Sequence, residues 1–255
     1  MFNLSGKTAI VTGGSGLYGK QITLALAQAG AHVYIASRNV ENNKDYAKVL
    51  LNQGYSVQAE FLDQSDEESI TTLERRISSC GRSVDILVNN SVLRTMSSFE
   101  DDAAQFEASM KVNATGIFLM TRIFGGHMAS QGKGSIINIG SYMGTLGPDD
   151  TLYRDVGFSG FNSPDYFFHK GGMTNFTKFA AAYYGPKGVR CNIVQLGGFY
   201  NGQDSKFVER YSERTFLKRM AGDTDIMGIV VFLASDASAY ITGASIPVDG
   251  GYSAK

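Results

Sequence analysis

The sequence has little charge, little proline and almost no cysteine, and it has no tryptophan. Of its 255 residues, 18% are charged, 4 are Pro and 2 are Cys, whereas about 25% of an average soluble domain is charged. Two cysteines cannot build a disulfide framework. Because 43% of the residues are hydrophobic, the composition also excludes a disordered chain.

The charges of the two signs cancel, and no long apolar run is present. Lys and Arg number 23 against 24 Asp and Glu, which leaves no long-range field to attract nucleic acid. No apolar stretch approaches the roughly 20 residues that a membrane helix needs. The first residues, 1–7, lack a signal-peptide pattern. The sequence therefore predicts a cytoplasmic protein that binds a small molecule and neither nucleic acid nor membrane.

Short apolar runs alternate with longer amphipathic segments along the whole chain. Strands are expected at 8–12, 31–36, 57–61, 84–88, 135–139, 189–196 and 244–248. Helices are expected at 21–29, 42–53, 66–79, 102–128 (one or two), 164–184 and 223–234. This alternation predicts an α/β fold, a Rossmann-like doubly wound parallel sheet of about seven strands with helices on both faces. No repeat or linker divides the chain, so we expect residues 1–255 to form a single domain.

A glycine-rich segment, TGGSGLYG at 12–19, separates the first strand from the first helix. Glycines allow the backbone to approach a pyrophosphate closely, and a helix N-terminus supplies N–H groups and partial positive charge. A glycine cluster in this place predicts dinucleotide binding. The candidate cofactor-binding residues of the loop are Thr12, Gly13, Ser15, Gly16, Leu17, Tyr18 and Gly19.

The end of the second strand bears on which dinucleotide is bound. An acidic residue here would bind the ribose 2′-hydroxyl of NAD, but this sequence has Ser37 followed by Arg38. A guanidinium can pair with a 2′-phosphate, so NADP(H) is favoured, and NAD(H) stays open because Arg38 could be a solvated loop residue. Asp63 could accept a hydrogen bond from the adenine amino group, or it could cap the following helix.

Two residues of the helix expected at 164–184 can carry acid–base chemistry. Tyr166 and Lys170 are spaced i and i+4, so they lie on one helical face, one turn apart. A nearby ammonium favours the phenolate and lowers the pKa of a tyrosine. Ser141 follows the fifth expected strand, at the sheet edge where α/β proteins bind ligands. His169 points to a different helical face, and no spacing of His, Cys, Asp or Glu suggests a metal site.

These landmarks stand in the order of a known family. The chain resembles a short-chain dehydrogenase/reductase over essentially its whole length, through the loop at 12–19, Asp63, Asn89–Asn90, Asn113, Ser141, Tyr166, Lys170 and the glycines at 243 and 250–251. The resemblance implies that Tyr166 is the general acid or base and that Lys170 lowers its pKa and binds the nicotinamide ribose. It implies that Ser141 orients the substrate and that Asn113 holds a water that links Lys170 to solvent. Asn90 and Gly197 become candidate cofactor-binding residues, and residues 197–222 become a mobile lid.

The resemblance and the composition together predict a homotetramer. Low charge and the apolar segments 116–124 and 176–184 leave more helix surface than one domain can cover.

The segment between Ser141 and Tyr166 is longer than is usual in this family. Residues 147–158 bring Asp149, Asp150, Arg154 and Asp155 close to the expected active site. The hypothesis is an NADP(H)-dependent oxidoreductase that interconverts a secondary alcohol and a ketone on a sugar, sugar acid or polyol. The segment could instead be a surface loop with no role in substrate binding.

Two other functions stay open. The spacing TGxxGxxG resembles the branch of the family that modifies sugar nucleotides, which suggests an epimerase or dehydratase. The same fold could also serve as a non-catalytic dinucleotide-binding protein.

Overall fold

Seven parallel strands form one sheet at the centre of the molecule, in the order β3-β2-β1-β4-β5-β6-β7. The computed structural model describes residues 1–157 and 163–254. The strands are β1 (Thr8–Thr12), β2 (His32–Ser37), β3 (Val57–Phe61), β4 (Ile86–Asn89), β5 (Gly134–Ile139), β6 (Val189–Leu196) and β7 (Ser245–Val248). The strand order reverses between β1 and β4, which confirms the predicted doubly wound sheet and opens a crevice at that point.

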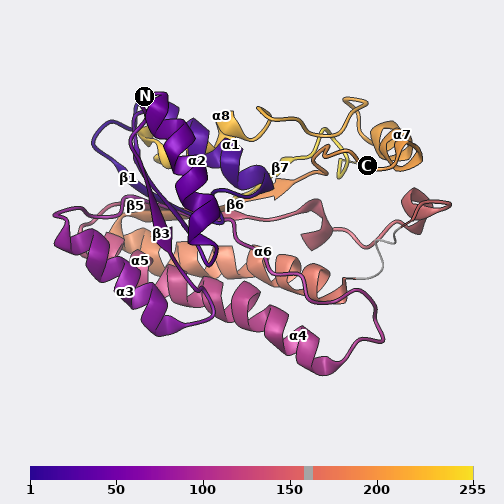
Figure 1. Cartoon of the computed structure of the whole chain (residues 1–255), viewed down its shortest axis with the longest axis horizontal. Helices are drawn as coiled ribbons and strands as arrows, with labels where there is room; N and C mark the ends of the chain where they lie inside the picture. Colours follow the sequence, from indigo (N-terminus) through magenta and orange to yellow (C-terminus); the bar gives the residue numbers. More distant parts are fainter. Residues whose placement is uncertain (158–162, 255) are drawn as a thin grey trace.

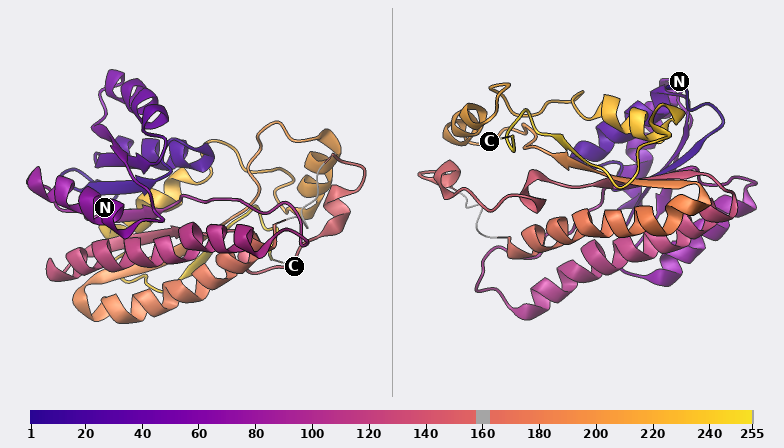
Figure 2. Two further views of the ribbon diagram at one scale, coloured as in Figure 1. Left: turned by 60° about the horizontal axis from the view of Figure 1, so that its bottom comes forward. Right: turned by 180° about the vertical axis from the view of Figure 1, so that it is seen from behind.

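Helices cover both faces of the sheet (Figures 1 and 2). One layer holds α1 (Leu17–Gln28), α2 (Val40–Asn52) and α8 (Met227–Ala234). The other holds α3 (Glu67–Ser79), α4 (Ala103–Met110), α5 (Ile117–Ser130) and α6 (Pro164–Tyr184). The helix α7 (Ser205–Arg214) lies beyond one end of the sheet, beside the short helical turn Asp150–Tyr153. No helix within the described ranges combines the length and the apolar composition needed to cross a membrane.

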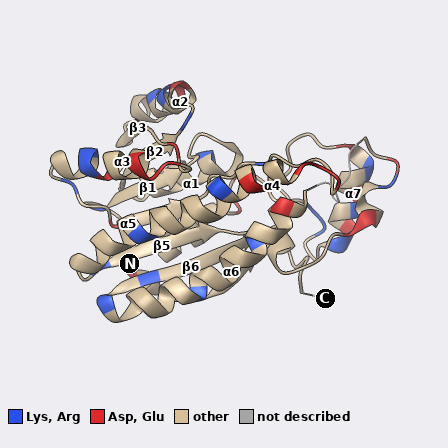
Figure 3. Ribbon diagram, turned by 90° about the horizontal axis from the view of Figure 1, so that it is seen from below, with Lys and Arg blue, Asp and Glu red and all other residues tan. Residues whose placement is uncertain are grey.

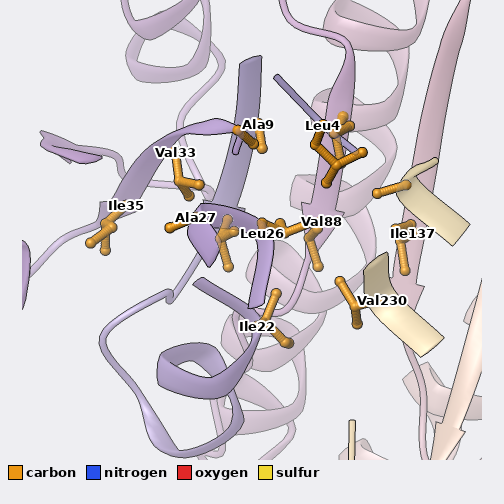
Figure 4. Packing of buried hydrophobic residues seen from close by; sticks show 14 of the residues in the cluster. Leu4, Ala9, Ile22, Leu26, Ala27, Val33, Ile35, Val88, Ile137 and Val230 are labelled. Atoms are coloured by element: carbon orange, nitrogen blue, oxygen red, sulfur yellow. The ribbon is translucent and has the colours of Figure 1, made fainter. Parts of the chain in front are cut away.

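The central strands β1, β4 and β5 are buried almost throughout, because helices cover both of their faces, whereas the edge strands β3 and β7 are partly exposed. On one face, Ile22 and Leu26 of α1 pack with Val88 of β4, Ile137 of β5 and Val230 of α8 (Figure 4). On the other face, a second cluster joins strand residues such as Ile10 and Ile136 to α3, α5 and α6. Two cores of this kind are the expected consequence of a parallel sheet between helix layers.

The helix and strand limits differ from the prediction mainly where glycine or polar residues obscure the pattern. The bounds of α6 and β6 are as predicted. The helix α1 begins at Leu17, whereas the predicted start is 21. The prediction is late because Gly19, a residue that rarely favours helix, lies in the first turn of α1. The helix α7 was not predicted. Its signals are Asp204, whose carboxylate accepts from the Lys206 N–H at 2.8 Å, and the buried pair Phe207 and Tyr211 one turn apart.

Buried amides fasten α6 to the sheet. Asn138 of β5 is fully buried, and its Nδ2 donates to Thr177 Oγ1 of α6 at 2.8 Å. Its Oδ1 accepts from Asn89 Nδ2 of β4 at 2.8 Å. A polar chain of this kind stabilises the fold only while every member keeps its partner.

We expect Asn138→Ala to lower the free energy of unfolding by about 2 to 3 kcal/mol, because it removes two buried hydrogen bonds. The Asn89 amide then keeps only the 3.4 Å contact with Thr121 Oγ1, and the Thr177 hydroxyl keeps only its bond to the Met173 carbonyl. Urea unfolding at fixed protein concentration measures the change. The control is Asn52→Ala, at the exposed end of α2, which should change the value by less than about 0.5 kcal/mol. Equal effects of the two substitutions would show that the network does not hold α6.

Candidate functional site

A cavity of about 710 Å³ opens at the carboxyl ends of the strands. Its walls come from the segments that follow β1, β2, β4, β5 and β6, and from α6 and α7. Of the predicted site residues, those that line it are Gly13, Gly16, Leu17, Tyr18, Ser37, Arg38, Asn90, Ser141, Tyr166, Lys170 and Gly197. Those that do not are Thr12, Ser15, Gly19, Asp63 and Asn113.

The glycine loop folds tightly against the start of α1. A Cβ atom at Gly19 would lie 2.0 Å from the Gly13 carbonyl oxygen, so only glycine permits this approach. No side chain caps the N-terminus of α1, and its first turn carries no acidic residue. Free N–H groups and partial positive charge therefore face the cavity, which fits a pyrophosphate.

Thr12 and Asn90 hold the loop in this shape. Asn90 Nδ2 donates to the carbonyl oxygens of Thr12 at 2.9 Å and Gly13 at 3.1 Å. The N–H groups of Asn90 and Ser91 donate to Thr12 Oγ1. Tyr18 Oη donates to the Gly197 carbonyl at 3.0 Å and so links the loop to the segment after β6.

A buried asparagine that sequence reasoning missed organises the outer end of the cavity. Asn43 of α2 accepts hydrogen bonds from Ser15 Oγ at 2.7 Å and from Ser37 Oγ at 3.0 Å. An asparagine in the first turn of a helix carries no sequence signal for this role. Arg38 is exposed beside these hydroxyls, and no described acidic side chain forms an ion pair with it.

Asp63 turns back onto its own segment. Its carboxylate accepts from the N–H of Ser65 at 2.9 Å and from its hydroxyl at 2.7 Å, while Asp66 caps α3. Burial opposes ionisation of Asp63, but the Ser65 hydrogen bonds and the charges of Arg38 and Lys111 hold its pKa below the ordinary value.

Ser141, Tyr166 and Lys170 meet at the inner end of the cavity. Ser141 follows β5, and its N–H donates to Gln195 Oε1 at 2.9 Å, which fixes the backbone there. Lys170 is 3% exposed, and its Nζ donates to the Ile139 carbonyl at 2.6 Å. The same nitrogen lies 5.5 Å from the centre of the Tyr166 ring. The predicted spacing therefore brings the ammonium and the phenol together.

The surroundings of Tyr166 favour its ionised form. Burial of the phenol raises its pKa, but the charges of Lys170 and then Arg94, with hydrogen bonds from Ser141 and Arg94, lower the pKa below its ordinary value. Burial also lowers the pKa of Lys170, and the adjacent phenol opposes that shift. The site is thus arranged for proton transfer at the tyrosine oxygen.

Arg94 was not predicted as a site residue. Its guanidinium carbon lies 4.5 Å from the centre of the Tyr166 ring, and its positive charge lowers the pKa of the phenol. The available signal was its place shortly after β4, at the sheet edge that also presents Ser141.

Asn113 and His169 lie outside the cavity. Asn113 is buried in the π-helical turn Lys111–Gly116, and its Nδ2 donates to the Leu93 carbonyl at 2.6 Å and to Ser109 Oγ at 2.9 Å. Its Oδ1 accepts from the Leu93 N–H at 2.9 Å. Burial, followed by the charge of Lys170, lowers the pKa of His169 to about 3, so this imidazole is neutral. The described residues contain no group of three or more His, Cys, Asp or Glu able to hold a metal ion.

The charged segment before α6 does not present its carboxylates to the cavity as expected. Asp149 pairs with Arg214 of α7 at 2.5 Å, and Asp155 lies 3.8 Å from Arg210 of the same helix. Figure 3 shows acidic and basic residues gathered around α7. Of the described residues at 147–157, only Tyr153 lines the cavity, and Phe158 lies outside the described residues. The expectation failed because cations distant in sequence fold onto these acids.

Comparison with known proteins identifies relatives over nearly the whole chain. A family model described as enoyl-(acyl carrier protein) reductase matches residues 15–253. Galactitol 2-dehydrogenase of Rhizobium johnstonii is 31% identical over 98% of this chain and 96% of its own. The 3-oxoacyl-[acyl-carrier-protein] reductase of Aquifex aeolicus is 32% identical over 97% of this chain and 98% of its own.

Solved structures share the complete architecture. A gluconate 5-dehydrogenase from Burkholderia cenocepacia, in complex with NADP and tartrate, is 26% identical and superposes with a TM-score of 0.90. The superposition covers 100% of this chain and 98% of the other. The match to the family model, the full-length relatives and the shared architecture together show that this chain belongs to the short-chain dehydrogenase/reductase family.

Proposed function

We propose that this protein is an NADP(H)-dependent dehydrogenase that interconverts a secondary alcohol and a ketone on a sugar, sugar acid or polyol. One observation carries the proposal: Ser141, Tyr166 and Lys170 line the same cavity as the glycine loop, with the Lys170 ammonium 5.5 Å from the centre of the Tyr166 ring. Relatives named for galactitol and gluconate oxidation support the substrate class.

Each residue of the group has a role in moving one proton. During oxidation, Tyr166 as phenolate takes the proton of the substrate hydroxyl, and during reduction it returns that proton to the carbonyl oxygen. Ser141 donates a hydrogen bond to the same oxygen and stabilises its negative charge. Lys170 favours the ionised form of Tyr166 and would hold the ribose of the dinucleotide. A bound nicotinamide would supply the hydride chemistry at the substrate carbon.

Proton relay to solvent is proposed to pass through the main chain at Asn113. Both side-chain groups of Asn113 already bond to Leu93 and Ser109. A water that links Lys170 to solvent would therefore be held by a carbonyl of the π-helical turn rather than by the amide.

We propose that residues 197–222 form a lid over substrate and cofactor, within a chain that is one domain. Gln203, Phe207, Tyr211 and Met220 of this segment line the cavity. All seven strands share one sheet, which supports the single domain. The free thiols of Cys80 and Cys191 are in keeping with a cytoplasmic location.

We expect Tyr166→Phe to lower kcat by about 10²- to 10⁴-fold, because it removes only the proton-transferring oxygen. NADP(H) affinity, measured by fluorescence titration, should stay near that of the parent protein. The control is Tyr183→Phe, an exposed position on the same helix, which should leave kcat unchanged. A Tyr166→Phe protein that keeps a tenth of the parent kcat would exclude the proposed acid–base role. A parent protein that binds NADP(H) but turns over no alcohol or ketone would favour the non-catalytic alternative.

We expect Arg38→Ala to weaken NADPH binding by roughly 1–3 kcal/mol, since a charged hydrogen bond to the 2′-phosphate is lost. NADH lacks this phosphate, so its affinity should not change and serves as the internal control. Titration of the parent protein with both dinucleotides tests the preference itself. Equal or tighter binding of NADH would contradict it.

The proposed assembly is a homotetramer. The helices α5 and α6 lie side by side on the outer face (Figure 3), and large apolar side chains on them remain exposed. Phe179 is 66% exposed and its ring stacks on Tyr183, which is 55% exposed. Exposed apolar groups that are contiguous mark an interaction surface.

Light scattering at micromolar concentration should give a mass of four chains. Phe179→Asp should lower that mass, because it introduces a charge into the apolar surface, whereas Phe99→Asp, at an exposed phenylalanine that precedes α4, should not. A parent mass of one chain would refute the assembly.

A further inference from the structure

The cavity is lined by positive charge that no carboxylate balances. Three cations, Arg38, Arg94 and Lys170, are among the described residues that line it, and none of those residues is an aspartate or a glutamate. A concave site with charges of one sign concentrates ligands of the opposite sign. The cavity is therefore suited to anionic groups at more than one position.

Two of the three cations already have roles in the proposed function. Arg38 follows β2 at the outer end, beside the Ser15, Ser37 and Asn43 cluster, where the dinucleotide phosphate is proposed to bind. Lys170 is buried, and its ammonium donates to the Ile139 carbonyl and lies beside the Tyr166 phenol. Arg94 remains. It is exposed at the cavity wall, with its guanidinium carbon 4.5 Å from the centre of the Tyr166 ring.

Two acids of the segment before α6 form ion pairs with other cations, and Asp165, which precedes Tyr166, is buried, accepts a hydrogen bond from Ser109 and does not line the cavity. Asp149 pairs with Arg214 and Asp155 with Arg210. Among the described residues, no carboxylate oxygen lies within 4.0 Å of the Arg94 guanidinium. Arg94 therefore has no carboxylate partner among the described residues, and its guanidinium can bind an anionic ligand group.

Arg94 also lies at the right distance from the reacting atoms. In the proposed function, the substrate oxygen bonds to the Tyr166 hydroxyl, and the Arg94 guanidinium lies over the ring of the same residue, with its central carbon 4.5 Å from the ring centre. The guanidinium is therefore a close neighbour of the reacting oxygen. A guanidinium in that position reaches a carboxylate a few carbons from the reacting carbon, and its planar fork matches carboxylate geometry.

We infer that Arg94 forms a carboxylate subsite beside Tyr166, so that the protein acts on a hydroxy acid of the sugar-acid class in preference to the matching neutral polyol. This inference rests on the proposed function. It assigns substrate selection to a residue outside the Ser141, Tyr166 and Lys170 group.

Binding of a matched ligand pair tests the subsite without turnover. Tartrate and threitol share a four-carbon skeleton and differ only in carboxylate against hydroxymethyl ends. Calorimetry with the NADP⁺-loaded parent protein should show tartrate binding at least about ten-fold more tightly than threitol. Arg94→Gln should weaken tartrate binding by about 10- to 100-fold, the scale of a lost charged hydrogen bond, and leave threitol within about two-fold. Arg94→Lys should restore part of the loss, and the control Arg75→Gln, on the exposed face of α3, should change nothing.

Measurements of turnover distinguish a failure of the carboxylate subsite from a failure of the proposed function. With gluconate and glucitol, and with galactonate and galactitol, Arg94→Gln should lower kcat for both members of a pair, because Arg94 also lowers the pKa of Tyr166, and should raise KM for the acid alone. The ratio of kcat/KM for the acid to kcat/KM for the polyol should therefore fall by about 10-fold or more. If Arg94→Gln leaves that ratio unchanged, or if tartrate binds the parent and Arg94→Gln proteins alike, the subsite is refuted. If tartrate binding depends on Arg94 but no acid or polyol is turned over, the subsite stands and the proposed function fails.

Discussion

The burial of the Lys170 ammonium is the constraint on which the site depends. A charge removed from water is costly unless hydrogen bonds and an opposite charge compensate it. Here the Ile139 carbonyl and the Tyr166 phenol supply that compensation. The first fixes α6 against the end of β5, and the second pulls the phenol toward ionisation. The stability of the helix and the acidity of its tyrosine are therefore two consequences of one buried charge.

That arrangement requires α6 to keep a fixed position along the direction of the strands. The buried amides of Asn89 and Asn138 and the hydroxyl of Thr177 provide the fixed point. Gln195 of β6 extends the same polar layer, because it accepts from the Ser141 N–H and donates to Thr174 Oγ1 at 2.9 Å. Hydrogen bonds in a region without water are directional, so they set the positions of Ser141 and Tyr166 more sharply than apolar packing alone.

The two ends of the cavity are organised by different physical means. At the dinucleotide end, the main chain dominates, through the close approach of Gly13 and Gly19 and the uncapped start of α1. At the substrate end, side-chain charge dominates, through Lys170 and Arg94. Of the described residues between Gly147 and the start of α6, Tyr153 and Ser163 line the cavity and the acids do not. The acids of this segment instead fasten it to α7, which joins two parts of the substrate wall into one unit.

The sequence by itself determined the order of strands and helices, the glycine loop, and the pairing of Tyr166 with Lys170, because each is a local pattern with a fixed period or place. It also led to the family, since the landmarks stand in a fixed order along the chain. Only the tertiary structure determined which charged side chains pair with one another and which face the cavity. Asp149 and Arg214 are far apart in sequence, as are Arg94 and Tyr166, and no local pattern encodes such contacts. Likewise, the side-chain amide of Asn113 forms hydrogen bonds with the main chain of Leu93. These bonds form only when the segment after β4 folds over the π-helical turn.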